Sequence, residues 1–289
     1  SEIDDMRSLV NEFRYEEAVR AFEKLKERIW ANASDKVKYR VLTNLGNAYY
    51  HWHKFDKAGP LFIEAYQYNP DDETSLTNLA IASSFDGDFE SVEKYARKVL
   101  EKNPASINGY CILLQIPPYK DSLETAIALV PEKLSRVSLI AHCLGLVAQN
   151  EGKFDIASEF FEMAVETDTE NNPDYKAYLA ATLMQTLSTT NRCFVIGQIS
   201  TADRQTLERA IELLTSAWER IEKTELNTVH PAWLLNRGIA KKLLGDIEGA
   251  FEDGRRAYDL DPTNPEFTRH FAMILLRKEE PDAAIKVLE

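Results

Sequence analysis

The residue types that catalyse reactions or hold metal ions occur in this chain, but their spacing does not bring them together. Of the five histidines, His51 and His53 lie two residues apart in a segment with helical periodicity. Residues two apart point to different faces of a helix, whereas two metal ligands on one helix are normally four apart. The sequence has no glycine-rich phosphate loop, no Gly-x-Ser-x-Gly and no His-Glu-x-x-His. We therefore predict that the chain is not an enzyme and carries no metal or cofactor.

Cysteine usage and hydropathy bear on the compartment. Cys111, Cys143 and Cys193 make an odd count without the close spacing of zinc ligands. This usage is typical of a reducing compartment. No apolar run reaches the roughly 18 residues that a membrane helix needs, and no signal peptide is recognisable. These features predict a cytoplasmic protein.

The charge balance is strongly acidic. The chain has 47 Asp and Glu residues against 34 Lys and Arg, which gives a formal net charge of -13. A surface of this sign repels phosphate backbones and anionic membranes. We therefore expect neither nucleic acid nor a membrane as the partner. The carboxylates are scattered along the chain, as on the solvent faces of helices.

A unit of 34 residues occurs twice in register, over 39–72 and 73–106. Gly46 is followed after one period by Ala80, and Pro70 by Pro104. The first copy carries Leu42, Leu45, Gly46, Tyr49, Phe55, Ala58, Phe62 and Ala65, and the second carries Leu76, Leu79, Ala80, Phe89, Val92, Ala96 and Val99. Apolar residues at helical spacing, a small residue in each helix and a closing proline predict two packed helices per unit.

This pattern resembles the tetratricopeptide repeat (TPR) family, whose units have the same period. The segment 44–50, Asn-Leu-Gly-Asn-Ala-Tyr-Tyr, is close to the consensus sequence of that family. The resemblance implies an all-α fold, a right-handed α–α superhelix (a TPR solenoid) of about seven helical hairpins. It also implies that Gly46 faces Ala58 where the two helices cross, and that each hairpin covers the next.

The remaining units vary in quality. Residues 2–29 predict an N-terminal hairpin, and the third unit is degenerate because Pro117 and Pro118 must end its first helix early. The fifth unit contains an insertion over 188–203 with the β-prone run 193–196, and we expect it to be ordered. We predict one solenoid over 1–289. Because the chain stops inside a helix, we expect it to be a fragment of a longer protein.

The concave wall of such a solenoid is the expected binding surface. It is built by the first helix of each unit and mixes amide, hydroxyl, aromatic and aliphatic groups with few charges, which suits a polypeptide. The predicted partner-binding residues are Arg40, Thr43, Asn47, Tyr50, His51, Thr74, Asn78, Ile81, Asn108 and His142. We expect the centre of this surface at Asn47, Tyr50, Asn78 and Ile81.

A narrower hypothesis comes from chaperone adaptors of the TPR family, which hold a C-terminal carboxylate with two asparagines and several cations. Asn47 and Asn78 match the two asparagines. Thr43, Asn108 and Ile112 stand where the cations are needed. Without those charge-assisted bonds the match to a carboxylate clamp is incomplete.

The resemblance implies a non-enzymatic protein-interaction module. The first hypothesis is the sensor or regulatory part of a larger signalling protein. The alternative is a free-standing scaffold or a chaperone-adaptor-like protein. The fold does not name the partner or the oligomeric state, and the full-length gene would separate the two hypotheses.

Overall fold

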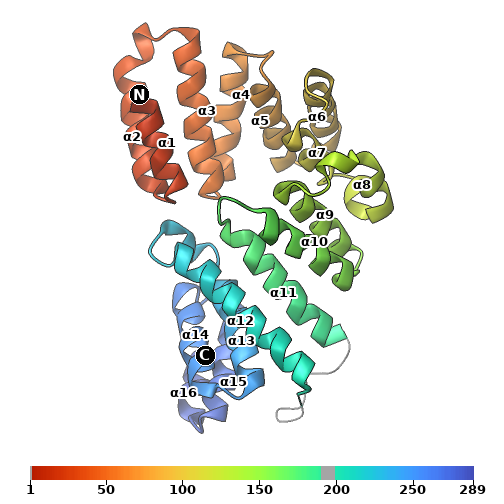
Figure 1. Cartoon of the computed structure of the whole chain (residues 1–289). Coiled ribbons are helices and arrows are strands. Elements are labelled where there is room, and N and C mark those ends of the chain that lie inside the picture. The colour runs from red at the N-terminus through yellow and green to blue at the C-terminus, as the bar shows by residue number, and fades with distance from the viewer. Residues whose placement is uncertain (1, 190–198) are drawn as a thin grey trace. The chain divides into compact units, whose positions relative to one another are not determined.

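The computed structural model of the chain describes residues 2–189 and 199–289. Within these ranges it contains sixteen α-helices and four short 3-10 helices, and no strand (Figure 1). The expected all-α fold is confirmed. The number of described helices is slightly more than seven hairpins need and is consistent with the expected number of about seven.

The chain forms two compact units, Ser1–Glu151 (unit 1) and Gly152–Glu289 (unit 2). The prediction of one solenoid over 1–289 stays a prediction. Unit 1 contains α1 (Glu2–Asn11), α2 (Tyr15–Ile29), α3 (Asp35–His51), α4 (Phe55–Tyr68), α5 (Glu73–Phe85), α6 (Phe89–Lys102), α7 (Ile107–Leu113), α8 (Leu123–Leu129) and α9 (Ser138–Asn150). Unit 2 contains α10 (Phe154–Thr167), α11 (Pro173–Thr189), α12 (Thr201–Ile221), α13 (Pro231–Leu244), α14 (Ile247–Leu260), α15 (Pro265–Arg277) and α16 (Pro281–Leu288). The 3-10 helices are Trp30–Asn32, Tyr119–Asp121, Glu132–Leu134 and Glu225–Thr228.

Local sequence sets the helix boundaries. Asp72 caps α5, its carboxylate accepting from the N–H of Thr74 at 3.0 Å, and Asp88 caps α6 in the same way through Ser91 at 3.1 Å. Such caps satisfy N–H groups that have no partner inside the helix. The turn between α5 and α6 contains Gly87 with φ +70°, a backbone conformation that favours glycine.

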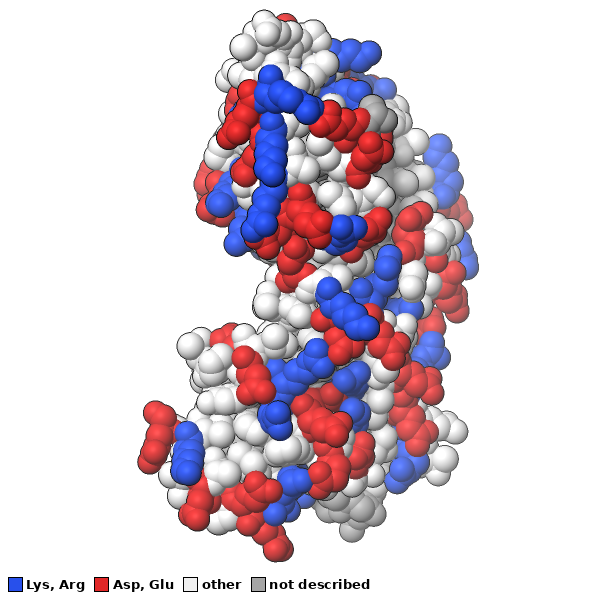
Figure 2. All heavy atoms as spheres, turned by 90° about the vertical axis from the view of Figure 1, so that its left-hand side faces the viewer, with Lys and Arg blue, Asp and Glu red and all other residues white. Residues whose placement is uncertain are grey.

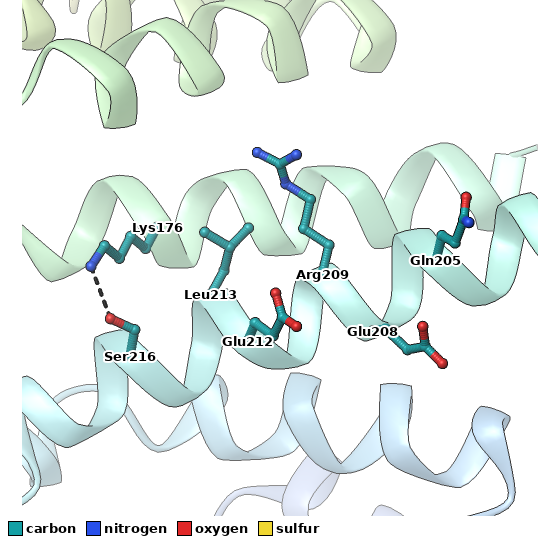
Figure 3. Close-up of a pocket in the computed structure, with 7 residues that line it drawn as sticks. All are labelled: Lys176, Gln205, Glu208, Arg209, Glu212, Leu213 and Ser216. Carbon is teal, nitrogen blue, oxygen red and sulfur yellow. Dashed lines mark hydrogen bonds between the residues drawn. The ribbon is translucent and has the colours of Figure 1, made fainter.

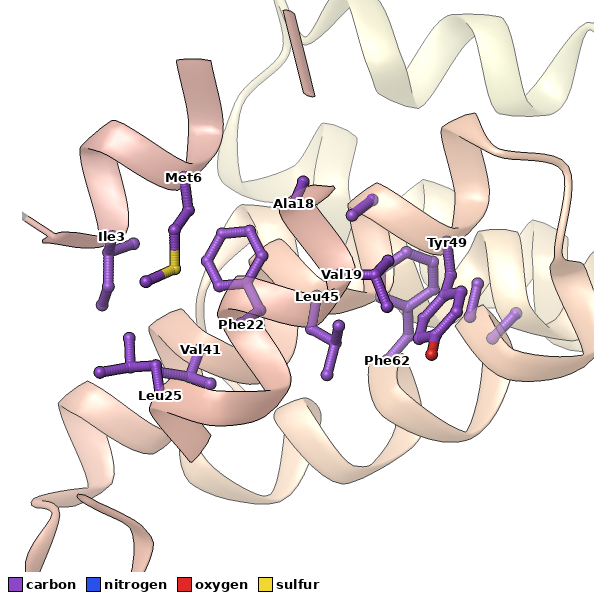
Figure 4. Close-up of a cluster of buried hydrophobic side chains, with 13 residues drawn as sticks. Ile3, Met6, Ala18, Val19, Phe22, Leu25, Val41, Leu45, Tyr49 and Phe62 are labelled. Carbon is purple, nitrogen blue, oxygen red and sulfur yellow. The ribbon is translucent and has the colours of Figure 1, made fainter. Parts of the chain in front are cut away.

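The core of unit 1 lies between successive helices (Figure 4). Phe22 of α2 and Phe62 of α4 are fully buried in it, together with Val41 and Leu45 of α3. Gly46 allows α3 to approach α4, because a Cβ at this position would lie 2.6 Å from Cε1 of Phe62. The sequence predicted Ala58 as the neighbour of Gly46, and the phenylalanine ring one turn further along α4 is the group that needs the space.

Helices α7 and α8, which form the third repeat unit after the N-terminal hairpin, depart from the others, as the sequence predicted. The first helix, α7, has only seven residues and ends at Leu113, ahead of the cis peptide bond between Pro117 and Pro118. The second, α8, ends at Leu129 before Pro131 and packs against α9. The two short helices thus leave α9 as the last long helix of unit 1.

In unit 2, helices occupy both ends of the expected insertion over 188–203. Helix α11 continues to Thr189, and α12 begins at Thr201. The run 193–196, with its β-prone composition, lies outside the described residues. None of the described helices combines the length and apolar character that crossing a membrane requires.

Candidate partner-binding groove

The predicted binding residues all lie in unit 1, on α3, α5, α7 and α9. Arg40, Thr43, Asn47, Tyr50 and His51 come from α3, Thr74, Asn78 and Ile81 from α5, Asn108 from α7, and His142 from α9. These helices are the first members of their pairs, and α7 packs against both α5 and α9. We call the surface formed by these ten residues the groove.

The groove residues differ in how much surface they offer. His51, Thr74 and Asn108 are exposed, whereas Arg40, Asn47, Tyr50, Ile81 and His142 are half-buried. Thr43 and Asn78 are only 7% and 5% exposed. The sequence did not predict that Thr43 and Asn78 are buried.

Tyr50 lies in an aromatic cluster. Its ring is stacked on that of Phe85 at 6.2 Å between centroids, and the rings of Phe55 and Phe62 are 5.7 and 6.5 Å away. Burial, and to a smaller extent the nearby thiol of Cys143, raise the pKa of Tyr50. The phenol therefore stays protonated at neutral pH and can donate a hydrogen bond. Because Phe55 is 39% exposed, the cluster also offers apolar surface to a partner.

Like Thr43, whose hydroxyl forms no hydrogen bond with the described residues, Asn78 has an unsatisfied polar atom. Its amide nitrogen is buried and forms no hydrogen bond with the described residues. The hydroxyl of the adjacent Thr77 is in the same situation. Buried polar groups are nearly always hydrogen-bonded, so an exception calls for an explanation. Since this nitrogen is shielded from solvent, a partner can reach it only after the amide group turns.

Thr43 and Arg40 are engaged inside unit 1. The hydroxyl of Tyr39 donates to Asp72 at 2.6 Å, and the hydroxyl of Thr43 lies beside it. Burial, and then the hydrogen bond to Asp72, raise the pKa of Tyr39. Arg40 forms an ion pair with Asp4 of α1 at 3.2 Å. Thr43 thus belongs to the packing between α3 and α5, and Arg40 points toward α1.

The two groove histidines are uncharged at neutral pH. Burial lowers the pKa of His142 to about 4. The pKa of His51 is also lowered, first by desolvation of its ring by packed neighbours, although the residue keeps exposed surface, and then by the charge of His53. Among the described residues, no group of three His, Cys, Asp or Glu side chains is arranged to hold a metal ion. The groove therefore offers hydrogen-bonding and aromatic groups, with no site built for metal chemistry in the part of the chain that is described.

Phe55 and Cys143 belong to this site and were not predicted as part of it. Phe55 follows the turn after α3, and the sequence placed it only as a repeat residue. Cys143 is buried on α9, where it hydrogen-bonds to the thiol of Cys111; that bond and burial raise the pKa of Cys111. The sequence could not show whether a small apolar residue such as Cys143 lines the binding surface or belongs to the core.

A separate depression of about 450 Å³ lies in unit 2, on α11 and α12 (Figure 3). Its lining mixes both signs of charge: Lys176, Gln205, Glu208, Arg209, Glu212, Leu213 and Ser216. Lys176 donates to Ser216 at 2.8 Å, and Arg209 pairs with Glu162. The charged side chains are spread over the molecular face seen in Figure 2 in the same mixed way. This depression contains no arrangement of nucleophile and base.

Comparisons with known proteins yield structural matches alone, since no protein-family model and no curated sequence matches the chain. The structure titled APC/C hetero-tetramer Cut9-Hcn1 matches with a TM-score of 0.65 and 16% identity over 98% of this chain. Human IFIT1, in a structure titled as a dimer with PPP-AAAA, matches with a TM-score of 0.64 and 13% identity. The match covers 94% of this chain and 65% of the IFIT1 chain. A tetratricopeptide repeat protein from Parabacteroides merdae matches with a TM-score of 0.52 and 15% identity. The match covers 95% of this chain and 97% of that protein's chain.

These matches show that the chain has the fold of tetratricopeptide repeat proteins, as its 34-residue period predicted. The chain spans only 51% of the Cut9-Hcn1 chain that it matches.

Proposed function

We propose that the chain is a non-enzymatic, cytoplasmic interaction module that binds a polypeptide segment in the groove of unit 1. The segment lies along α3, α5 and α7, with an apolar side chain against Tyr50 and Phe55. Main-chain groups of the segment bond to the amides of Asn47 and Asn78. Peptides are bound in this way when polar anchors fix the main chain and aromatic surfaces receive side chains.

The observation that carries this proposal is the buried, unpaired amide of Asn78. An unpaired buried amide costs the free chain about 1–3 kcal/mol. A partner that supplies a carbonyl oxygen to accept from this nitrogen recovers the free energy on binding. The aromatic cluster around Tyr50 supports the same location, because aromatic side chains are frequent anchors at interfaces.

The net charge of -13 favours a polypeptide over nucleic acid as the partner. Within this class, we propose that the chain serves as the sensor or regulatory part of a larger signalling protein. The alternative is a free-standing scaffold or a chaperone-adaptor-like protein.

The groove is tested with peptides selected from a random library against the whole chain. The double variant Asn47→Ala with Asn78→Ala should weaken binding of a selected peptide by about 2 kcal/mol or more, as measured by fluorescence anisotropy. The matched control is Asn32→Ala with Gln205→Ala, which removes two exposed amides outside the groove. Equal loss in both variants, or no loss in either, would show that the groove assignment is wrong.

Stability provides a second readout. Because the nitrogen of Asn78 has no partner, Asn78→Ala alone should leave the melting temperature of the free chain unchanged or higher. A variant that is at least as stable but binds less tightly identifies a residue kept for binding. If Asn78→Ala instead lowers the melting temperature by several degrees, the amide has a structural role. The rival site is the outer surface together with the insertion over 188–203, and deletion of that insertion should leave peptide affinity unchanged.

A further inference from the structure

Unit 2 has a row of basic side chains on its inner helices α13 and α15. The row consists of Lys242 on α13 and Arg269, His270 and Arg277 on α15. Helix α13 packs against both α11 and α15, so these helices form one layer. Nζ of Lys242 lies 3.3 Å from Nε2 of His270, which joins the two helices.

The three cations of this row are without counter-charges. Among the described residues, no carboxylate forms an ion pair with Lys242, Arg269 or Arg277. The other cations of α13 differ from them, since Arg237 and Lys241 both contact Asp253, at 2.6 and 2.8 Å. In a chain with a net charge of -13, three neighbouring unpaired cations are an unexpected feature.

The row is also electrostatically unfavourable in the free chain. Burial, followed by the charge of Arg277, lowers the pKa of Lys242. Burial, followed by the charges of Lys242 and Arg269, lowers the pKa of His270 to about 4. His270 is therefore neutral and accepts from Lys242 through Nε2. An anion placed beside Lys242 would remove the repulsion that these groups now experience.

Exposed apolar side chains lie among the cations. Met273 and Leu276 of α15 are 47% and 55% exposed. Arg269, Met273 and Leu276 follow a spacing of four and three, which places them on one face of the helix, and Arg277 continues it. We call the surface formed by Lys242, Arg269, Met273, Leu276 and Arg277 the basic–apolar strip.

We propose that the basic–apolar strip is a second binding surface, which takes an acidic polypeptide segment carrying apolar side chains. Glu or Asp carboxylates pair with Lys242, Arg269 and Arg277, and a leucine-like side chain packs between Met273 and Leu276. Arginine is suited to this role because its guanidinium donates two parallel hydrogen bonds to one carboxylate. Nucleic acid fits less well, since three cations neutralise few phosphates and Met273 and Leu276 have no base-stacking rings.

The test uses a fluorescein-labelled peptide, Glu-Glu-Leu-Glu-Glu-Leu-Glu-Glu, and the full chain. We expect saturable binding by fluorescence anisotropy that weakens as salt is raised, because the contacts are between opposite charges. The double variant Arg269→Gln with Arg277→Gln should weaken binding about tenfold or more. Both arginines are exposed and unpaired, so the variant should fold normally. Met273→Gln should weaken binding by a smaller factor.

The matched control is Arg204→Gln with Arg255→Gln, which removes the same charge from exposed sites on α12 and α14 of unit 2. It should bind the acidic peptide within about twofold of the parent chain. A peptide with Gln in place of every Glu should not bind. Absence of binding by the acidic peptide, equal loss in both double variants, or tighter binding of a single-stranded oligothymidine would overturn the proposal.

The strip and the groove are tested independently. Asn47→Ala with Asn78→Ala should leave binding of the acidic peptide unchanged, because those residues lie in unit 1. If that variant abolishes binding of the acidic peptide while the strip variant does not, the acidic segment binds in the groove and the strip proposal is wrong.

Discussion

At Gly46 the difference between a hydrogen atom and a methyl group decides how closely α3 and α4 can pack. The ring of Phe62 fills the space that a Cβ would take, and this ring is almost fully buried. A fully packed core has little free volume, so neither side can move without cost. The small residue in the repeat pattern therefore reflects one specific contact in this molecule.

We predict that Gly46→Ala lowers the free energy of unfolding by roughly 1–3 kcal/mol, because the added methyl group overlaps the Phe62 ring. Urea unfolding measured by circular dichroism gives the value. Phe62→Leu should be destabilising alone, but the double variant should lose less than the sum of the two single changes. Strictly additive losses would mean that the contact with Phe62 is not the cause.

His270 gives unit 2 a dependence on pH. Burial and two neighbouring cations hold its pKa at about 4, whereas an unfolded histidine titrates near about 6.5. The unfolded chain therefore binds a proton first as the pH falls. Stability is present above about pH 6.5 and is lost as the pH falls toward about 4.

Between pH 7.5 and 4.5 we expect this group to contribute a loss of roughly 2 kcal/mol in the free energy of unfolding. The comparison of the parent chain with His270→Gln isolates it, since glutamine can still accept from Lys242 but does not titrate. The variant should lose less stability over this range. Identical pH profiles for the two chains would contradict the assigned pKa direction of His270.

At the scale of helices, one carboxylate joins α13 to α14. Asp253 is buried and receives Nε and Nη2 of Arg237 at 2.9 and 2.6 Å and Nζ of Lys241 at 2.8 Å. Arg237 also donates to Thr215 of α12 at 3.3 Å. A single acidic residue thus satisfies two cations on the helix before it, and three helices share the network.

Asp253→Asn should lower the free energy of unfolding by about 3–5 kcal/mol, because two largely buried cations lose their counter-charge. The matched control is Glu248→Gln, which breaks an ion pair with Lys278 whose carboxylate is 76% exposed, and it should cost less than about 1 kcal/mol. Thermal unfolding compares the two variants. Similar melting temperatures for both would show that the Asp253 network is no more important than a surface pair.

Sequence alone predicted the helical pairs well because the 34-residue period, the small residues and the prolines are local signals. The ten predicted binding residues fall on helices α3, α5, α7 and α9, and their role in binding stays a prediction. It did not predict that Thr43 and Asn78 are buried, since helical spacing gives the face of a residue but not how far the next helix covers it. Nor could it predict that Lys241 forms an ion pair whereas Lys242 does not. The difference arises because Asp253 of α14 lies beside Lys241, and His270 of α15 lies beside Lys242.

At the scale of the whole chain, helical repeats contact mainly their neighbours, so stability is expected to be local. Gly46→Ala should accelerate amide hydrogen exchange in α3 and α4 and leave α13–α16 unchanged. Asp253→Asn should do the reverse. Hydrogen exchange measured by mass spectrometry on both variants tests this, and faster exchange throughout the chain in either one would indicate a single cooperative unit.

The sharing of Asp253 between Arg237 and Lys241 also constrains how this sequence can drift over generations. A change of Asp253 alone leaves two cations without a counter-charge. A change of Arg237 or Lys241 alone still leaves the carboxylate paired with the remaining cation. Descendants of this sequence should therefore keep all three residues or replace them together with apolar ones. Lys242, one residue beyond, forms no ion pair with Asp253 and is free of that constraint.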